Sequence, residues 1–448
     1  AALLILAAAG VAGPARLLLA LAFITFVPGW ALLGHLPLAH GVARLALVVA
    51  LSLTICTALA QALLWLRWWN PGAMLAVLAA ASVTARILVR HHRRVVGSVT
   101  AVPDDHTGDL PLPFVDRRPS SAAHQPAMNG ERIAVVLCTR DRDEYLATSL
   151  KLLRLLEYGW FEVVVVDNAP SSTATRDCFM RMAGDDLRFR YVVEPVPGLS
   201  RARNRGMVAT DARYVAFTDD DTRVDARWLD GLAAGFARAP EVGCVTGLVT
   251  PAELDTAAQR YFDRRFSWAS RVDPRMFSLD DRQGLSRLYP YSAGLFGTGA
   301  NFAVDRRLFQ GLGGFDVALG AGTPAGGGED LDAFVRILRA GYALAYEPSA
   351  VVWHYHRRDN RALRRQLFRY GAGLTAFLAK YASDRQTTGD IVARLPPGVR
   401  QIVTLWSPTT LGTRPPAGMV LAEVAGMAAG PLAYAVGRQR TRAGGTAR

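Results

Sequence analysis

Apolar and polar positions divide the chain into two parts with different periodicity. In the first part, long apolar runs occupy Leu17–Leu33, Leu45–Leu66 and Ala73–Val89. Each run is about long enough to cross a hydrocarbon core of ~30 Å as a helix. A cleaved signal peptide would explain one such run but not three. We therefore predict a membrane domain of about three transmembrane helices in residues 1–95, with a soluble helical bundle as the alternative.

Polar residues after these runs indicate how the chain is oriented. The basic cluster Arg90–Arg94 follows the third run, and basic residues beside a membrane helix favour the cytoplasmic side. Residues 96–130 are rich in Pro, Ser, Asp and His and lack apolar periodicity, which is typical of a linker. We expect a multi-pass protein of the cell membrane whose remaining part lies in the cytoplasm.

From residue 131 the pattern changes to short apolar strands that alternate with helical periods. Val163–Val166, for example, is β-branched throughout and is followed by a polar turn and a helix. Such alternation predicts an α/β fold, a mostly parallel sheet flanked by helices, over residues 131–358. No GxGxxG follows the first strand and no GxxxxGK[ST] is present, which excludes the common dinucleotide and P-loop sites.

The segment Tyr214–Asp221, "YVAFTDDD", ends a predicted strand in three carboxylates. Ligands of open α/β sheets bind at the carboxyl ends of the strands. Adjacent carboxylates repel each other unless a positive charge lies among them. A hard divalent cation with oxygen ligands, bridging to phosphate, would supply that charge. A solvated acidic turn is the alternative.

Charge and cysteine content narrow the classes of partner. The 448 residues carry a net charge of +13, which suits anionic lipid, phosphorylated substrates or nucleic acid. No nucleic-acid-binding motif accompanies the charge, so we expect no nucleic-acid partner but a lipid bilayer. The four cysteines are far apart and form no CxxC pair, which argues against a zinc site or a disulfide framework.

Seven segments in this order make the chain resemble the family 2 inverting glycosyltransferases of GT-A fold. The segments span about Arg132 to Arg357 and read "VVLCTRDR", "VVVVDNAPS", "GLSRARNRG", "FTDDDTRVD", "GTGANFAV", "GGGEDLDAFVRILRAGY" and "VVWHYHR". The resemblance covers about half the chain. It implies a nucleotide-diphosphate sugar as donor and a hydroxyl group as acceptor.

The resemblance also implies which residues hold the donor. Thr139 and Arg140 match positions near the base and ribose, and Asp167 matches the acid that binds the nucleobase, although a helix cap is its alternative. Arg203 and Asn204 match a helix beside the diphosphate, with ordinary surface solvation as the alternative.

The same resemblance places the cation. Asp219 and Asp221 match the DxD motif that holds Mg²⁺ or Mn²⁺ and the donor, and His354 matches a position that completes such a site, with a purely structural histidine as the alternative. Asp220 would face away from the ion, because side chains alternate along an extended backbone, and would contact ribose or be solvated.

Glu329 and Asp330 match the family's ED motif, which implies the catalytic base. We assign the base to Asp330, with Glu329 as its rival; an acidic helix cap is the alternative for both. Asp332 is expected to be exposed. Gly297, Thr298 and Gly299 match an acceptor-binding loop, where small residues let the substrate approach the backbone.

Residues 359–448 are predicted to form basic amphipathic, membrane-associated helices. Gln366, Arg369 and Tyr370 resemble the QxxRW signature of processive polysaccharide synthases, with Tyr in place of Trp, which implies acceptor binding. Only one doubtful apolar segment, Pro415–Gly437, follows them, and it contains Glu423. We therefore do not expect processivity, and a fourth span is the less favoured interpretation of that segment.

The resemblance, together with the predicted membrane helices, implies a membrane-anchored, metal-dependent inverting glycosyltransferase, and this is the function that we expect. The predicted location favours a lipid-linked or cell-envelope glycan as acceptor. Two alternatives stay open: transfer to a small or peptide-derived cofactor, and a catalytically inactive GT-A binding module.

Overall fold

We describe the protein from a computed structural model, for residues 14–33, 48–49, 51–57, 59–60, 70, 74, 76–80, 82, 131–280, 288–292, 294–405 and 416–445. The chain divides into two units, Ala1–Ser121 and Ala122–Arg448. The basic cluster Arg90–Arg94 and residues 97–130 of the predicted linker lie outside the described residues, as do half of Leu45–Leu66 and most of Ala73–Val89.

The first unit contains helix α2 (Pro14–Leu33) and shorter helical stretches within 48–82. Cys56, Met74 and Leu78 form a small apolar core against Phe23 and Ile24 of α2. The apolar part of α2, Leu19–Ala31, is shorter than a span needs. The predicted N-terminal membrane helices therefore stay a prediction.

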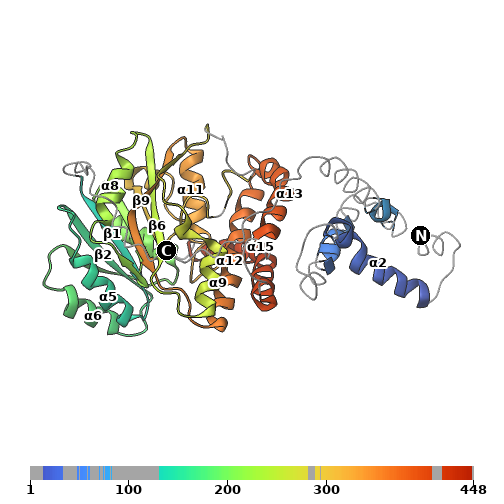
Figure 1. Cartoon of the computed structure of the whole chain (residues 1–448), viewed down its shortest axis with the longest axis horizontal. Coiled ribbons are helices and arrows are strands. Elements are labelled where there is room, and N and C mark those ends of the chain that lie inside the picture. The colour runs from blue at the N-terminus through green and yellow to red at the C-terminus, as the bar shows by residue number, and fades with distance from the viewer. Residues whose placement is uncertain are drawn as a thin grey trace, which may run out of the picture. The chain divides into compact units, whose positions relative to one another are not determined.

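The second unit is built on one mixed β-sheet (Figure 1). In the described part of the chain its nine strands have the order β3-β2-β1-β4-β8-β6-β9-β5, with β7 also beside β9. The strands are β1 (Ile133–Thr139), β2 (Phe161–Asn168), β3 (Phe189–Glu194), β4 (Tyr214–Asp219), β5 (Thr222–Val224), β6 (Val242–Pro251), β7 (Arg275–Phe277), β8 (Asn301–Asp305) and β9 (Ala343–His354).

Strand direction departs from the predicted mostly parallel sheet. Strands β3, β2, β1 and β4 are parallel, and β6 is parallel to β9. Strand β8 runs antiparallel to both β4 and β6, and β5 and β7 run antiparallel to β9. The prediction was wrong here because periodicity identifies a strand without giving its direction. The reversal places the start of β8 next to the end of β4.

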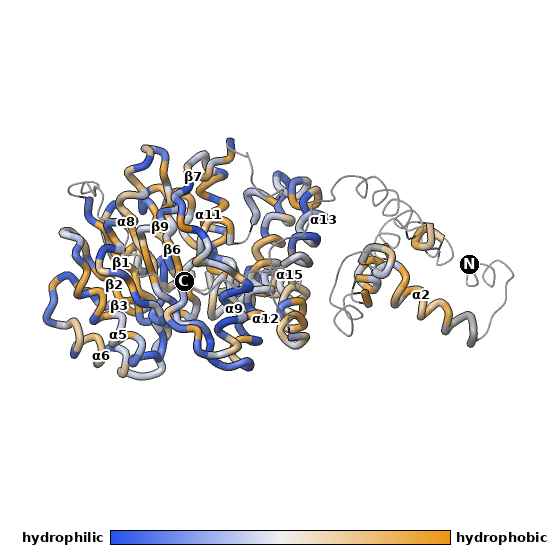
Figure 2. The backbone as a smooth tube through the Cα atoms, viewed as in Figure 1, coloured by the Kyte–Doolittle hydropathy of each residue, from blue (hydrophilic) through white to orange (hydrophobic). Residues whose placement is uncertain are grey.

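Helices cover both faces of the sheet because successive strand residues point to opposite sides. Ile133, Val135 and Leu137 face α5 (Asp143–Arg154), α6 (Ala174–Ala183) and α8 (Trp228–Phe236). Ala134 and Val136 face α7 (Leu199–Val208), α10 (Arg306–Gly311) and α11 (Glu329–Arg339). Figure 2 shows the apolar strands between more polar helices.

The C-terminal helices pack on this α/β part. They are α12 (Asn360–Ala382), α13 (Thr388–Leu405) and α15 (Ala417–Gly445), and α9 (Ala257–Phe266) lies against α12. Leu363 and Leu367 of α12 are buried with Phe262 of α9, and Phe377 is buried with Val335 of α11. The apolar positions of α12, which we expected to face a membrane or an acceptor, are thus largely used within the protein.

Helix α15 is one continuous helix in spite of Pro431 and Glu423. It lies so close to α12 that a Cβ at Gly426 would meet the Phe368 carbonyl oxygen at 1.9 Å. Glu423 accepts a 2.6 Å hydrogen bond from Arg265 of α9, and both side chains are buried. Among the described helices, only Ala417–Arg442 within α15 is long and apolar enough to cross a membrane.

Candidate active site

The three adjacent aspartates lie at the carboxyl end of β4, in the middle of the sheet. Asp219 ends the strand, and Asp220 and Asp221 form the turn into β5. Asp220 and Asp221 are buried, whereas about a third of the Asp219 side chain is exposed. Buried carboxylates need partners, because an unpaired charge is costly to remove from water.

Arginines supply the positive charge that these carboxylates need. Arg142, just before α5, donates to both Asp220 and Asp221, and Arg357 donates to Asp221 at 3.3 Å. Thr139 Oγ1 donates to the second Asp220 oxygen at 2.8 Å. Asp220 is therefore bound on both oxygens, and the expectation that it could be solvated was wrong. The guanidinium groups of Arg142 and Arg357 thus supply positive charge to Asp220 and Asp221.

Arg203 of α7 joins the two acidic segments of the site. Its side chain is only 2% exposed and contacts Asp219 at 3.3 Å and Glu329 at 3.1 Å. It also donates to the Gly299 carbonyl oxygen at 2.8 Å. Phe217, Phe302 and Phe315 surround the guanidinium. Because it is enclosed, Arg203 holds the acids in place, and the structure does not present it to a diphosphate.

The carboxylates around Arg203 have shifted proton affinities. Burial, and after it the nearby Asp330, raise the pKa of Glu329 to about 7, against the effect of Arg203. Burial likewise raises the pKa of Asp219 to about 6, while Arg203 opposes the shift. Two carboxyl groups at the centre of the site thus titrate close to neutral pH.

Asp330 begins α11 beside the predicted acceptor loop. Its Oδ2 accepts a 2.8 Å hydrogen bond from the Gly299 amide, and its side chain is half-buried. Gly297 has a φ of 135°, where a Cβ would also meet Thr246 at 2.7 Å. Only glycine adopts this conformation readily. The structure thus brings Gly297–Gly299, Asp330, Glu329 and Asp219 to one place.

Asp332, two residues further along α11, is not exposed as we expected. It is fully buried and paired with Arg336 and Lys380, each at 2.8 Å, and it accepts from Tyr381 at 3.2 Å. Lys380 and Tyr381 come from α12, so Asp332 fixes α11 to the C-terminal helices. The sequence pattern did not predict the burial of Asp332, because Lys380 and Tyr381 lie about fifty residues further along the chain.

Asp167 is the penultimate residue of β2, where it pairs with Thr139 of β1. One oxygen accepts a 2.6 Å hydrogen bond from Tyr191 of β3. The other oxygen, Oδ1, is buried and has no hydrogen-bond partner in the described structure. Burial raises the pKa of this carboxyl. An unpaired buried acceptor is costly and suits a ligand N–H group, as the expected nucleobase contact requires.

Other predicted donor residues have different surroundings. The Arg140 side chain is half exposed and lies 3.8 Å from Asp141. The Asn204 amide exchanges two hydrogen bonds with the backbone of Phe315, at 2.9 and 2.8 Å. Asn204 therefore anchors the loop before α11 and does not join the acidic cluster. Of the two arginines in the "TRDR" motif, it is Arg142 rather than Arg140 that contacts Asp220 and Asp221.

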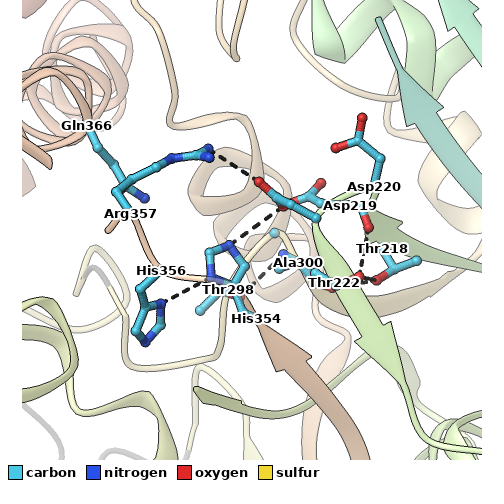
Figure 3. Close-up of polar contacts among 12 residues, drawn as sticks. Thr218, Asp219, Asp220, Thr222, Thr298, Ala300, His354, His356, Arg357 and Gln366 are labelled. Carbon is cyan, nitrogen blue, oxygen red and sulfur yellow. Dashed lines mark hydrogen bonds and ion pairs between the residues drawn. The ribbon is translucent and has the colours of Figure 1, made fainter. Parts of the chain in front are cut away.

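The predicted acceptor residues on α12 form a partly buried group. The Gln366 Nε2 donates to the Tyr370 hydroxyl at 3.1 Å, and Gln366 Oε1 is buried without a partner in the described structure. The Tyr370 ring packs against Phe266 of α9 at 5.3 Å. Arg369 is exposed and lies against Gly326, in the loop that leads to Glu329. Gln366 extends toward Arg357 (Figure 3).

His354 reaches the aspartates through strand pairing. Strand β9 aligns His354 with Thr222 of β5, which places its Nε2 3.8 Å from Asp221 Oδ1. Burial lowers the pKa of His354 to about 4, so its ring is neutral at pH 7. The Nδ1 atoms of His354 and His356 are 3.1 Å apart (Figure 3).

We tested the site for its fit to a divalent cation. Within the described ranges, no three His, Cys, Asp or Glu side chains lie close enough together to form a complete protein site. The Asp221 oxygen and the His354 nitrogen nevertheless face each other across 3.8 Å. Mg²⁺ often takes only one or two carboxylates and completes its shell with water and phosphate oxygens. The residues fit an ion that binds together with a diphosphate.

A cavity of about 630 Å³ opens beside Asp220 and Asp221. Its other walls include Tyr145 of α5, Arg223 of β5, Glu253, Tyr355 and Arg358. A volume of this size lies in the range of small-molecule sites. Arg142, Tyr191, His356 and Arg357 are site residues that we did not single out from the sequence. Arg142 and Arg357 could have been identified from the sequence, because they belong to the motifs "VVLCTRDR" and "VVWHYHR" that match the family.

Comparison with known proteins agrees with this geometry. The model of the glycosyltransferase-like family 2 matches residues 130–373, more than half of the chain. The chain belongs to this family. The match includes β1, the aspartates of β4, the start of α11 and the first turns of α12, so the family domain contains every site residue described above.

Two relatives are each similar to more than half of this chain. A pre-mycofactocin glycosyltransferase of Mycobacterium tuberculosis is 27% identical over 249 residues, which are 55% of this chain and 46% of that protein. The succinoglycan biosynthesis protein ExoM of Rhizobium meliloti is 29% identical over 280 residues, 60% of this chain and 78% of that protein. The chain thus spans about half the length of the first of these relatives.

Among solved structures, a similar one is the mannosyltransferase PcManGT of Pyrobaculum calidifontis in complex with GDP-Man and Mn²⁺. It is 20% identical, with a TM-score of 0.46, and the match covers 71% of this chain and 90% of that one.

Proposed function

We propose that this family 2 glycosyltransferase moves a sugar from a nucleotide-diphosphate donor to a hydroxyl acceptor with inversion. The observation that carries the proposal is the convergence of Asp219, Glu329 and Asp330 around Arg203 and Gly299. Leaving-group and acid–base residues come from segments about 110 residues apart. A catalytically inactive module would have no reason to keep three carboxylates together, one of them buried, because like charges repel and burying charge is costly.

The donor is proposed to bind along the carboxyl ends of β1, β2 and β4. The unpaired Asp167 Oδ1 would accept a nucleobase N–H. Asp219, whose side chain is partly exposed, would contact the donor beyond it. The guanidinium of Arg142, 32% exposed, is placed to move from the aspartates to a phosphate oxygen.

Asp221 and His354 are proposed to hold Mg²⁺ or Mn²⁺, with Asp219 close by. When bound, the ion would offset the charge that develops on the diphosphate leaving group. Asp221 Oδ2 stays in contact with Arg142 and Arg357, so its Oδ1 is the atom turned to the site.

Asp330 is proposed as the general base. An inverting transfer needs one base that removes the proton of the acceptor hydroxyl, and that base must be within hydrogen-bond reach of it. Asp330 is half-buried at the loop of Gly297–Gly299, whereas Glu329 is buried against Arg203. We therefore assign Glu329 to the support of the site and keep the base at Asp330.

Two acceptor classes have support. A lipid-linked or envelope glycan agrees with the relative named for succinoglycan biosynthesis, and with α15 as a candidate membrane helix. A peptide-derived acceptor agrees with the relative named a pre-mycofactocin glycosyltransferase. We favour the glycan acceptor and propose a membrane association with the catalytic unit in the cytoplasm.

The test is turnover of a nucleotide-sugar panel by the full chain with Mn²⁺, with both acceptor classes supplied. We expect Asp330→Asn to bind the donor normally and to lose transfer by at least about 100-fold, the size of a general-base contribution. Full transfer by Asp330→Asn would remove Asp330 as the base. An unchanged Asp221→Asn variant would contradict the proposed metal site.

A further inference from the structure

His354 and His356 form a pair of buried imidazoles whose outer nitrogens face two different carboxylates. Their Nδ1 atoms are 3.1 Å apart. His354 Nε2 lies 3.8 Å from Asp221 Oδ1, and His356 Nε2 lies 3.9 Å from Asp263 Oδ1. The contacts therefore run in a row from Asp221, through the two histidines, to Asp263 of helix α9, and Figure 3 shows the histidine pair of this row.

A hydrogen bond between two Nδ1 atoms requires one proton between them. In a neutral imidazole one nitrogen carries a proton and the other accepts. If His354 Nδ1 donates, His354 Nε2 is unprotonated and His356 Nε2 carries a proton. If His356 Nδ1 donates, the outer nitrogens have the reverse protonation. The tautomer of one ring thus fixes the tautomer of the other.

The outer carboxylates discriminate between these two arrangements. A protonated His356 Nε2 faces the negative charge of Asp263 favourably, whereas a bare nitrogen there would face it unfavourably. At the other end, a bare His354 Nε2 faces Asp221 unfavourably unless a cation lies between them. Asp263 therefore favours the arrangement that a bound cation at Asp221 would also favour.

Packing holds the His356 ring in the position that this pairing needs. Phe262 of α9 lies against it, with ring centroids 4.6 Å apart, and Trp268 meets both imidazoles edge-on. Gln259, also on α9, donates to the His356 carbonyl oxygen at 3.3 Å. Helix α9 itself begins with a capping box of Thr256 and Gln259.

We propose that His356, assisted by Asp263, is a positioning residue that sets the tautomer of His354, so that an unprotonated His354 Nε2 is presented to the cation site beside Asp221. The proposal rests on the divalent-cation part of the proposed function. His356 and Asp263 touch neither the ion nor the substrate; they act through His354. Partners of this kind commonly change metal affinity by 10–100-fold.

The experiment measures Mn²⁺ affinity of the full chain directly, by the electron paramagnetic resonance signal of free Mn²⁺. We expect His356→Phe, which keeps an aromatic ring but removes both nitrogens, to weaken Mn²⁺ binding by about 10–100-fold. His356→Asn should bind Mn²⁺ nearly as the wild type does, because an amide oxygen can accept the His354 Nδ1 proton. Asp263→Asn should give a smaller loss.

A double-variant cycle separates positioning from general damage. In a His354→Ala background, His356→Phe should have no further effect on Mn²⁺ affinity, because the residue through which it acts is gone. Equal Mn²⁺ affinity of wild type and His356→Phe would overturn the proposal. So would tighter binding by His356→Phe, since it would mean that His356 keeps a proton on His354 Nε2.

The proposed function fails in a distinguishable way. If the wild-type chain binds no Mn²⁺ and transfers sugar in the presence of a chelator, the metal part of the function is wrong and the inference falls with it. If His354→Ala loses Mn²⁺ binding while His356→Phe retains it, the inference alone is wrong.

Discussion

At the scale of single residues, Arg203 is the side chain on which the site depends most. It is enclosed by three phenylalanine rings and contacts Asp219, Glu329 and the Gly299 backbone. Buried ion pairs of this kind add little net stability as a whole, but removing one partner leaves the others uncompensated. Loss of Arg203 would therefore destabilise the protein mainly by leaving Asp219 and Glu329 without their counter-charge.

We expect Arg203→Gln to lower the free energy of unfolding by about 3–5 kcal/mol, because two buried carboxylates would lose their counter-charge. Urea unfolding of the full chain measures this. Arg205→Gln, on the exposed side of the same helix, is the matched control and should change little. Adding Glu329→Gln to Arg203→Gln should recover part of the loss; no recovery would contradict the uncompensated-charge explanation.

Stability should also depend on pH through Glu329. Its pKa is raised from 4.5 to about 7, so the folded protein binds this proton more tightly than the unfolded chain does. The resulting stabilisation is fully present below about pH 4.5 and is lost as pH rises through about 7. The shift corresponds to about 3 kcal/mol.

The measurement is the unfolding free energy of wild type and Glu329→Gln between pH 4.5 and 8. The variant, which cannot ionise at this position, should become more stable relative to wild type as pH rises. Asp219, whose pKa is raised to about 6, contributes in the same direction in both proteins and largely cancels in the difference. A constant difference across this range would show that Glu329 keeps an ordinary pKa.

From the sequence we could predict which residues meet at the site, but not which side chains surround them. The order of motifs was enough to predict that Asp219, Glu329 and Asp330 would meet. It was not enough to show that Asp332 is buried against Lys380, or that Asn204 binds a backbone loop, because those partners are distant in sequence. The clustered aspartates predicted a positive charge among them, but the sequence pattern did not identify Arg142 as a residue that contacts Asp220 and Asp221.

At the scale of elements, helix α15 shows how a polar residue inside an apolar stretch can be used within the protein. Glu423 made a membrane span the less favoured interpretation of that stretch. In the structure Glu423 pairs with Arg265 of α9, and Gly426 and Gly430 let α15 approach the backbone of α12. Glu423, Gly426 and Gly430 thus serve contacts of one face of α15 within the catalytic unit.

We expect Gly426→Ala to loosen this contact, because its Cβ would lie 1.9 Å from the Phe368 carbonyl oxygen. Hydrogen exchange of α12 and α15 should become faster by at least about 10-fold, the effect of a loss of roughly 1.4 kcal/mol. Gly418→Ala is the control on the same helix, since its Cβ would meet Arg364 only at 3.6 Å. Equal exchange in both variants would mean that the close approach does not hold α15 in place.

Strand existence was predictable from the apolar runs, while strand direction and length were not. Strand β9, for example, continues through Pro348, although proline usually interrupts a strand. The loop ending at Gly299 leads into β8, which enters the sheet in reverse beside β4. No periodicity encodes that reversal, yet it is what brings the acceptor loop to the aspartates.

At the scale of the whole molecule, every site residue described lies in the unit Ala122–Arg448. We expect a fragment of these residues to bind a nucleoside diphosphate within about two-fold of the full chain, since no described donor contact is removed. Isothermal titration of UDP and GDP into both proteins measures this. Loss of binding in the fragment would show that the N-terminal unit takes part in the donor site.

Assembly of the site along the chain follows from the pairing of β5 with β9. Asp221 is synthesised early, yet two of its neighbours, His354 and Arg357, emerge more than 130 residues later. Of the two described arginines that contact Asp221, only Arg142 is present before β9 has been synthesised. A ribosome-bound chain that ends before β9 would therefore contain the DxD motif and still be unable to form the cation site. Competence for the reaction is thus acquired only once β9 has been synthesised and has joined the sheet beside β5.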